Sequence, residues 1–280
     1  MLCKLDIHRR LGPGARWFNP GRAASGAGRL ALGVFIGGML VGGRVGGAPL
    51  MWQSAARPAS LVELYTSEGC SSCPPAEAWF SQLKDSPGLW RDFVPVAFHV
   101  DYWNDPGWRD PWSQEAFSDR QREYARVWGS ANIYTPEFVL NGAEWHRWFW
   151  QRQVPAGRGE DQGVLSASSE DGTHWRVAYA LPTGSAPGLR VYLLHTALLV
   201  SGVGSDIKAG ENSGRHLEHD FVALNLTEQP LVGKTNEFKG SFRVDEKLRP
   251  ATGRLALAVW LVEKGKLEPV QAVGGWLPRP

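Results

Sequence analysis

Apolar residues follow two kinds of pattern in the first half of the folded chain. Continuous apolar runs at 61–66 and 93–100 predict two buried strands. Between them, apolar residues recur at helical spacing from 76 to 83, and Pro74 and Pro75 fall in the first turn, where proline is tolerated. A strand, a helix and a second strand predict a βαβ unit with parallel strands and a right-handed crossover.

The pattern continues with a loop, a helix and a hairpin. Residues 101–112, "DYWNDPGWRDPW", are punctuated by Pro and Gly and predict a loop. The next segment, 113–129, predicts a surface helix that ends at Gly129. Asn141-Gly142 between two apolar runs predicts a tight β-hairpin. The expected apolar stripe of the helix consists of Phe117, Tyr124, Val127 and Trp128.

The composition and the apolar pattern of the chain change near residue 157. A polar, Gly- and Ser-rich segment at 157–173 is followed by short runs of Val, Leu and aromatic residues between turns, without a long helical stripe. Such runs predict a β-sandwich. We therefore expect three parts: an export signal or anchor with its linker at 1–58, an α/β domain with a mixed sheet and flanking helices at 59–156, and a mainly-β, sandwich-like domain at 157–280.

The first part has the pattern of an export signal. Basic residues precede the uncharged apolar run 30–43, which is shorter than the ~20 residues of a membrane span. Small residues follow in "GGRVGGA" and "SAA", where cleavage is expected. We expect an exported protein, periplasmic or extracellular, that is tethered to a membrane only if this segment stays uncleaved.

Composition narrows the class of protein. Of the 280 residues, 43% are hydrophobic and 21% charged, which is typical of a packed globular protein. The net charge is +2 and acids and bases are interspersed, so no basic stripe suggests nucleic acid. We expect the 14 tryptophans mainly to fill the core, with an aromatic surface for a ligand as the alternative.

Two of the three cysteines form a CxxC motif where strand 61–66 gives way to the helix. A disulfide between Cys70 and Cys73 closes a very small loop and stabilises little, so the pair needs another purpose. Unpaired amides at a helix N-terminus favour a thiolate, so we expect Cys70 to be exposed and nucleophilic and Cys73 to resolve the mixed disulfide. Glu68 would oppose this by raising the pKa of the Cys70 thiol.

The order of these elements resembles that of thioredoxin-like proteins. There, a proline before the hairpin is cis and faces the cysteine pair, which implies a cis Thr135-Pro136 bond and a free Thr135 backbone for an extended peptide. The segments that carry a more specific resemblance are "VELYTSEGCSSCPPAE", "FHVDYWNDPGWRDPW", "YTPEFVLNG" and "GENSGRHLEHDFV".

These segments are similar to the exported family called domain of unknown function 1223, whose first half is thioredoxin-like. The resemblance covers 61–142 and one motif at 210–222, and it implies a thioredoxin-like fold for 59–156, export and a redox pair at Cys70 and Cys73. Two features depart from the family: the segment after the hairpin lacks a clear amphipathic helix, and Leu224 stands where arginine is expected. The second departure argues against anion binding by that motif.

Other polar residues are candidates for auxiliary roles. His99 and Asp101 follow strand 93–100 at the end that borders the ligand crevice in open α/β sheets, so either could exchange a proton with Cys73. The alternative is that Asp101 caps the loop and His99 is a satisfied core group. Trp103 and its loop would either border the cysteine site or pack against other residues of the same loop.

The motif at 210–222 contains two histidines. His216 and His219 would face opposite sides of a strand, and no third ligand is apparent nearby, so metal binding by this pair is not expected. We expect the loop 210–215 to be structural, with Glu211 paired to Arg215.

These residues support three functions. The first is an exported thiol–disulfide oxidoreductase that acts on protein or small-molecule thiols and disulfides, with no cofactor besides its own disulfide. The second is a Cu(I)-binding or copper-delivery protein, because the soft thiolates of Cys70 and Cys73 with His99 suit Cu(I). The third is a non-catalytic partner-binding module in which the disulfide is vestigial.

Overall fold

The computed structural model describes residues 49–279, apart from residues 106, 152, 158, 187, 234 and 235. The predicted export segment therefore lies outside the described residues. Within the described ranges, no helix has the length and apolar character needed to cross a membrane.

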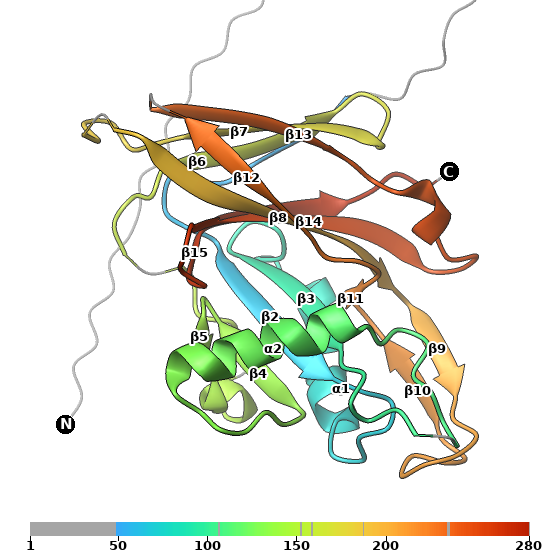
Figure 1. The fold of residues 1–280 in the computed structure, drawn as a ribbon. Helices are drawn as coiled ribbons and strands as arrows, with labels where there is room; N and C mark the ends of the chain where they lie inside the picture. Colours follow the sequence, from blue (N-terminus) through green and yellow to red (C-terminus); the bar gives the residue numbers. More distant parts are fainter. Residues whose placement is uncertain are drawn as a thin grey trace, which may run out of the picture. The chain divides into compact units, whose positions relative to one another are not determined.

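Two parallel strands lie near the centre of the largest sheet (Figure 1). β2 (Ser60–Thr66) and β3 (Phe93–His99) are buried along their whole length, as their continuous apolar runs predict. The helix α1 (Pro74–Ser81) and the 3-10 helix η1 (Gln82–Asp85) connect them, and the two strands pair in parallel. The predicted βαβ unit is confirmed.

The predicted helix and hairpin follow. α2 (Glu115–Trp128) ends at Gly129, whose φ is +70°. β4 (Glu137–Leu140) pairs antiparallel with β2 and turns into β5 (Ala143–Glu144). Asn141 and Gly142 both have positive φ, which this tight turn requires.

The buried face of α2 is partly charged, so the predicted apolar stripe is wrong in part. Val127 is 67% exposed, whereas Arg120 is buried. The Arg120 Nε donates to Glu63 Oε1 at 2.6 Å, and the Tyr124 hydroxyl donates to Glu63 Oε2. The Arg120 guanidinium also lies 5.4 Å from the centre of the Trp260 ring. α2 thus neutralises a carboxylate in the middle of β2.

Strands from the second half of the chain extend the same sheet. β11 (Val222–Ala223) pairs in parallel with β3 on one side and antiparallel with β8 (Arg190–Ser201) on the other. In the described part, this nine-stranded sheet runs β15-β14-β8-β11-β3-β2-β4-β5, and β12 also pairs with β8. The remaining strands are β12 (Thr227–Gly233), β14 (Arg254–Glu263) and β15 (Pro269–Trp276).

A second sheet lies over the β8, β14 and β15 end of the first (Figure 1). Its described strands, in the order β1-β6-β7-β13, pair antiparallel. Side chains of both sheets share one buried apolar cluster, which contains Trp175, Val177, Leu194 and Val259. The predicted packing of two sheets is therefore present. The strands are β1 (Leu50–Gln53), β6 (Val164–Ser169), β7 (His174–Ala180) and β13 (Glu237–Arg243).

The described chain is mostly β, with mixed sheets and only two α-helices. The other elements are a small ribbon and two 3-10 helices. These are β9 (Val203–Asp206), β10 (His216–His219), η2 (His146–Phe149) and η3 (Glu246–Leu248).

The structure corrects two predicted boundaries. β1 belongs to the folded protein although it falls in the predicted linker, and its Trp52 stacks on Trp175 with ring centres 4.5 Å apart. Cleavage at "SAA" would remove this strand.

The boundary at 157 does not separate two cores, because one buried cluster joins Phe98 of β3 to Phe221 and Trp260. β11 fills the edge of β3, so everything described from residue 49 onward lies in one unit.

The Arg120–Glu63 contact gives a test of this packing. We expect Arg120→Met to lower the free energy of unfolding by about 3–5 kcal/mol, because it leaves the Glu63 carboxylate buried and unpaired. The double variant Arg120→Met/Glu63→Gln should lose clearly less, and exposed Arg122→Met should change little. Urea denaturation measures all three, and equal losses in the single and double variants would contradict the ion-pair explanation.

Candidate functional site

The two cysteines lie where the sequence predicts, at the junction of β2 and α1. Cys70 and Cys73 form a disulfide, with their Cα atoms 5.5 Å apart. Cys73 is the N-cap of α1, and prolines occupy the first turn. The Cys73 N–H donates to the Cys70 carbonyl at 3.2 Å, so the segment between them is a tight turn.

The loop that contains Thr135 and Pro136 faces this turn. The Thr135-Pro136 peptide bond is cis, as the resemblance implies. The Ser72 hydroxyl lies 3.3 Å from the Cys70 sulfur and 3.5 Å from the Thr135 carbonyl oxygen. Ser72 therefore connects the disulfide to the Thr135 backbone.

The expectation that Cys70 is exposed is wrong. Both Cys70 and Cys73 are 0% exposed, and the two serines between them are the exposed part of the motif. A thiol reagent or substrate therefore reaches neither sulfur directly in this conformation. The loop 210–215, far away in the sequence, contacts the backbone around these cysteines.

This loop holds the backbone of the cysteine motif. The Glu211 carboxylate accepts a hydrogen bond from the Ser71 N–H at 3.1 Å. The buried Asn212 amide donates to the carbonyls of Glu68 and Cys70 at 2.9 and 3.0 Å. The Arg215 guanidinium donates to Asn212 at 2.8 Å, so the expected Glu211–Arg215 pair is not the contact that either residue makes here.

Buried ionisable side chains adjoin the motif. His219 of β10 lies between two carboxylates: its Nδ1 is 2.5 Å from Glu77 Oε2 and its Nε2 is 3.1 Å from Glu68 Oε1. Glu77 lies on α1, one turn after Cys73, and its N–H donates to the Cys73 carbonyl at 3.1 Å. The three ionisable residues are buried, so they form a desolvated network next to the cysteine segment.

The carboxylates set the charge of His219. Burial alone lowers the pKa of His219, but the charges and hydrogen bonds of Glu77 and Glu68 outweigh burial and raise the pKa to about 10. For Glu77, burial raises the pKa, and the interaction with His219 outweighs it and lowers the pKa. Glu68, the residue expected to act on Cys70, thus contacts the His219 ring at 3.1 Å.

His99 lies beside this network. Its Nδ1 is 2.8 Å from Asp110 Oδ2, and the two imidazole rings of His99 and His219 meet edge to face with centres 4.9 Å apart. The His99 Nε2 is buried without a hydrogen-bond partner in the described part of the chain. Asp101, the other predicted proton carrier, instead pairs with Ser118 at the start of α2.

Tryptophans of the loop 101–112 border the same region. The Trp103 indole donates to the Thr135 hydroxyl at 2.7 Å, and the Trp108 indole donates to Glu68 at 3.0 Å. A Cβ on Gly69 would lie 3.0 Å from the Trp103 carbonyl oxygen, so this approach favours glycine. The loop therefore lies against the site, which is the first of the two arrangements considered for Trp103.

The sequence patterns identify Glu68, His99 and the cysteines as candidates, but not Glu77, Asp110 or Asn212. The one local signal for Glu77 is a carboxylate four residues after Cys73, between the buried Ala76 and Phe80. The expectation that no third ligand residue lies near the histidines is wrong for His219, whereas His216 is exposed on the opposite side, as predicted.

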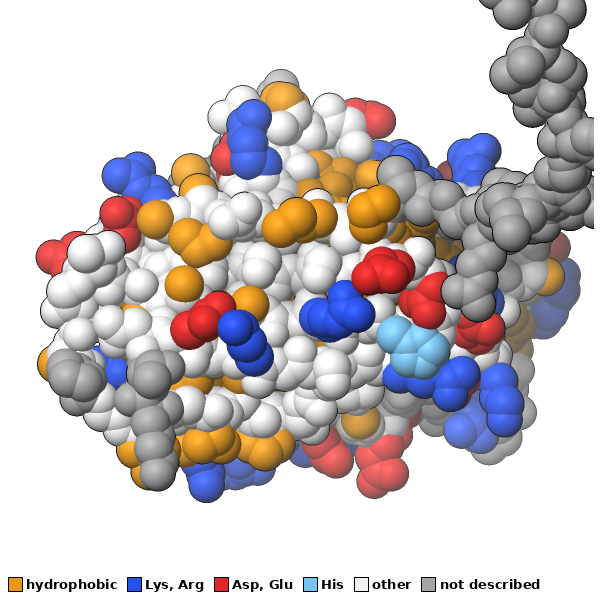
Figure 2. All heavy atoms as spheres, turned by 90° about the horizontal axis from the view of Figure 1, so that it is seen from above, with side chains coloured by type: hydrophobic (Ala, Val, Ile, Leu, Met, Phe, Trp, Pro, Cys, Tyr) orange, Lys and Arg blue, Asp and Glu red, His pale blue; other side chains and the backbone are white. Residues whose placement is uncertain are grey.

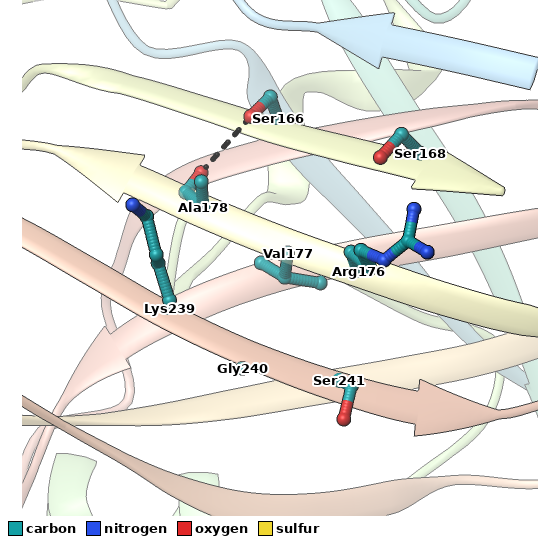
Figure 3. A pocket seen from close by; sticks show the side chains of 8 residues that line it. All are labelled: Ser166, Ser168, Arg176, Val177, Ala178, Lys239, Gly240 and Ser241. Atoms are coloured by element: carbon teal, nitrogen blue, oxygen red, sulfur yellow. Dashed lines mark hydrogen bonds between the residues drawn. The ribbon is translucent and has the colours of Figure 1, made fainter.

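Another hollow lies on the outer face of the second sheet. It has a volume of about 550 Å³ and small side chains line most of it (Figure 3). Its two cations are already paired, Arg176 with Glu170 at 3.3 Å and Lys239 with Glu237 at 3.1 Å. Acidic and basic side chains are interspersed on this face (Figure 2). It is therefore a weaker candidate than the disulfide region.

Fold and site define a mainly-β protein with a covered disulfide next to a buried ionic network. A family model described as "Protein of unknown function (DUF1223)" matches residues 61–261, more than two thirds of the chain, and the protein belongs to this family.

The fold is similar to that of a solved structure. Protein AGR_C_4864 from Agrobacterium tumefaciens, an X-ray crystal structure, is similar with a TM-score of 0.54 over 78% of this chain and 93% of that chain, at 20% identity. HBP35 of Porphyromonas gingivalis matches with a TM-score of 0.48 over 80% of this chain and 76% of that chain, at 11% identity. No curated protein matches the chain.

The loop contacts predict how readily the disulfide is reduced. Asn212→Ala removes two hydrogen bonds worth about 1 kcal/mol each, so dithiothreitol should reduce the folded variant roughly tenfold faster or more. Ser213→Ala in the same loop is the matched control. Alkylation followed by mass spectrometry measures the rate. An unchanged rate would show that the loop does not limit access.

Glu137, next to the cis proline, predicts a pH dependence of stability. Burial raises its pKa to about 7 despite the hydrogen bond from Gln121, and the charges of Glu144 and Glu63 add to the shift. Because the folded-state pKa exceeds the ordinary value of 4.5, the folded state binds the proton more tightly, and stability falls as pH rises from 4.5 through 7.

We therefore expect Glu137→Gln to raise the melting temperature relative to wild type at pH 8 and to leave it nearly unchanged at pH 4. Exposed Glu123→Gln should shift neither value. Thermal unfolding monitored by circular dichroism at both pH values checks this, and an equal effect of Glu137→Gln at both would contradict the assigned pKa.

Proposed function

We propose that this protein is an exported thiol–disulfide oxidoreductase that uses Cys70 and Cys73 on protein or small-molecule thiols and disulfides. The observation that carries the proposal is the disulfide at the N-terminus of α1, beside the Thr135 loop. A disulfide with two residues between its cysteines contributes little to stability, so exchange chemistry is the better reason for its presence.

A thioredoxin-like fold for residues 59–156 is part of the same proposal. The order β2, α1, β3, α2, β4, β5 supports it, with β2 and β3 parallel and β4 antiparallel to β2. The position of the disulfide between the first strand and the first helix of this order supports it further. The second half then adds strands and the covering loop to this unit.

The chemistry is a two-electron exchange. In the oxidised state, a substrate thiolate attacks the Cys70 sulfur, the disulfide opens and Cys73 leaves as a thiolate. A second substrate thiolate then attacks the substrate sulfur of the mixed disulfide and releases Cys70 as a thiolate. The substrate dithiol is oxidised to a disulfide and the protein is reduced. The reverse sequence reduces a substrate disulfide.

The local structure favours the thiolate forms. Pro74 and Pro75 have no N–H, and the N–H groups of Ala76 and Glu77 donate to the Cys73 carbonyl, so α1 favours an anion at its N-terminus through the helix dipole and not through unpaired amides. Reaction requires access to the buried sulfur of Cys70, so the proposal includes opening of the loop 210–215. Opening breaks the contacts of Glu211 and Asn212 with the cysteine motif.

Export is the remaining part of the proposal. The basic and apolar segment ahead of residue 48 has the pattern of a signal. Disulfides persist in oxidising compartments such as the periplasm or the extracellular space, which agrees with a disulfide-bonded Cys70 and Cys73.

Binding of Cu(I) by Cys70, Cys73 and His99 is a second candidate function. One observation favours it: His99 carries a buried nitrogen without a hydrogen-bond partner among the described residues. This function belongs to the reduced protein, because only thiolates are soft ligands for Cu(I).

Cysteine variants test the oxidoreductase. We expect Cys70→Ser to abolish insulin reduction and Cys73→Ser to accumulate a mixed disulfide with a substrate thiol, seen as a mass increase that dithiothreitol removes. Ser213→Ala should behave as wild type. Thiols that resist alkylation in the folded, reduced protein would contradict the proposal. A Cys70→Ser/Cys73→Ser variant that keeps full partner binding would also contradict it and would indicate a binding module.

A further inference from the structure

We propose that Glu77, His99 and His219 form a binding site for one divalent cation of the zinc class. A carboxylate oxygen of Glu77 and one ring nitrogen from each histidine lie within 4.8 Å of one another. The three residues are buried and come from α1, β3 and β10, which only the tertiary fold brings together.

His99 has the geometry of a metal-ligating histidine. Asp110 occupies its Nδ1 at 2.8 Å and fixes the orientation of the ring. The Nε2 is the nitrogen that remains, and it is buried with no hydrogen-bond partner among the described residues. A buried polar atom without a partner is costly, and a carboxylate on one nitrogen with a metal on the other is the usual arrangement of such histidines.

The other two ligands are oriented in the same way. Glu68 lies at the Nε2 of His219, which leaves Nδ1 to face Glu77. The Thr66 hydroxyl donates to Oε1 of Glu77, which leaves Oε2 to face His219. Each of the three proposed ligands therefore has a partner on its far side and a free or proton-sharing atom on the near side.

The distance between Glu77 and His219 indicates how cation binding would move these two side chains. Oε2 of Glu77 and Nδ1 of His219 are 2.5 Å apart, close enough to share a proton. Two ligands of a tetrahedral zinc ion are about 3.3 Å apart, given bonds of about 2.0–2.1 Å. The cation would take the place of the shared proton, which is released, and the two side chains would separate by less than about 1 Å.

The ligand set selects the cation. Two imidazoles and one carboxylate suit Zn²⁺ and leave a fourth position for water, whereas Mg²⁺ and Ca²⁺ require mostly oxygen ligands. Glu68 and Asp110 add negative charge around the site. A cleft of about 620 Å³ between α1 and β10 reaches one of the three ligands, Glu77, and its lining includes the acidic Glu218 and Asp220 together with the basic Lys84 and Arg215.

The site does not depend on the redox proposal. None of its three ligands is a cysteine, and the residues come together while Cys70 and Cys73 are joined. Metal binding can therefore be measured in the oxidised protein, where no thiolate of the pair competes. The Cys70→Ser/Cys73→Ser variant should bind Zn²⁺ as wild type does, so failure of one proposal leaves the other intact.

Metal titration provides the test. Oxidised, chelator-treated protein is titrated with Zn²⁺ by calorimetry and with Co²⁺ by visible absorption. We expect one ion per chain and the absorption of a low-symmetry, nitrogen-containing Co²⁺ site. His99→Ala and Glu77→Gln should each weaken binding at least tenfold, and Asp110→Asn should weaken it about 10- to 100-fold by releasing the His99 ring.

His216→Ala is the matched control, because His216 lies on the same strand and borders the cleft, but it is exposed and its Nδ1 pairs with Asp206 at 2.7 Å instead of the three ligands. It should bind as wild type does. His99→Gln keeps a polar group of similar size, so this variant is expected to fold. Zn²⁺ should raise the melting temperature of wild type and His216→Ala but not that of His99→Gln. The absence of a one-to-one complex in wild type, or wild-type affinity in His99→Gln, would overturn the proposal and leave a proton-bridged ionic network.

Discussion

The imidazole of His219 is held between Glu68 and Glu77, and this buried contact fixes how the two halves of the chain meet. The histidine comes from β10, whereas the two carboxylates flank the cysteine pair. Buried charges are strongly unfavourable unless they are paired, so neither half can keep its own charges inside without the other. β10 and its loop therefore lie against the cysteine turn, where the Asn212 amide donates to the Cys70 carbonyl.

The shared sheet has the same origin. β3 needs a partner on its second edge because an unpaired strand edge exposes backbone donors and acceptors. β11 supplies that partner and pairs on its other side with β8, which also forms one layer of the β-sandwich. The second half of the chain is therefore part of the first half's core, and Phe221 and Trp260 fill the space beside β2 and β3.

This arrangement brings a distant segment against the residues of the candidate chemistry. The disulfide lies where the sequence predicts and its cysteines are buried, and residues of the motif at 210–222 hydrogen-bond to the backbone around it. The same motif contributes His219 to the buried network. The proposed redox access and the proposed cation site thus share one loop-and-strand unit, and the fold alone would not have indicated either proposal.

Local sequence determined the elements whose signals lie within a few residues: the strands at 61–66 and 93–100, the helix after Cys73, the Asn141-Gly142 turn and the cysteine pair itself. Periodicity and turn chemistry act over such short spans, so these features follow without the rest of the chain. Tertiary structure alone decided the burial of Cys70, the grouping of Glu77, His99 and His219, and the place of β1 in the second sheet. Each of these depends on contacts between segments far apart in sequence, where pairing of buried charges and strand edges selects the partner, and no local pattern carries that information.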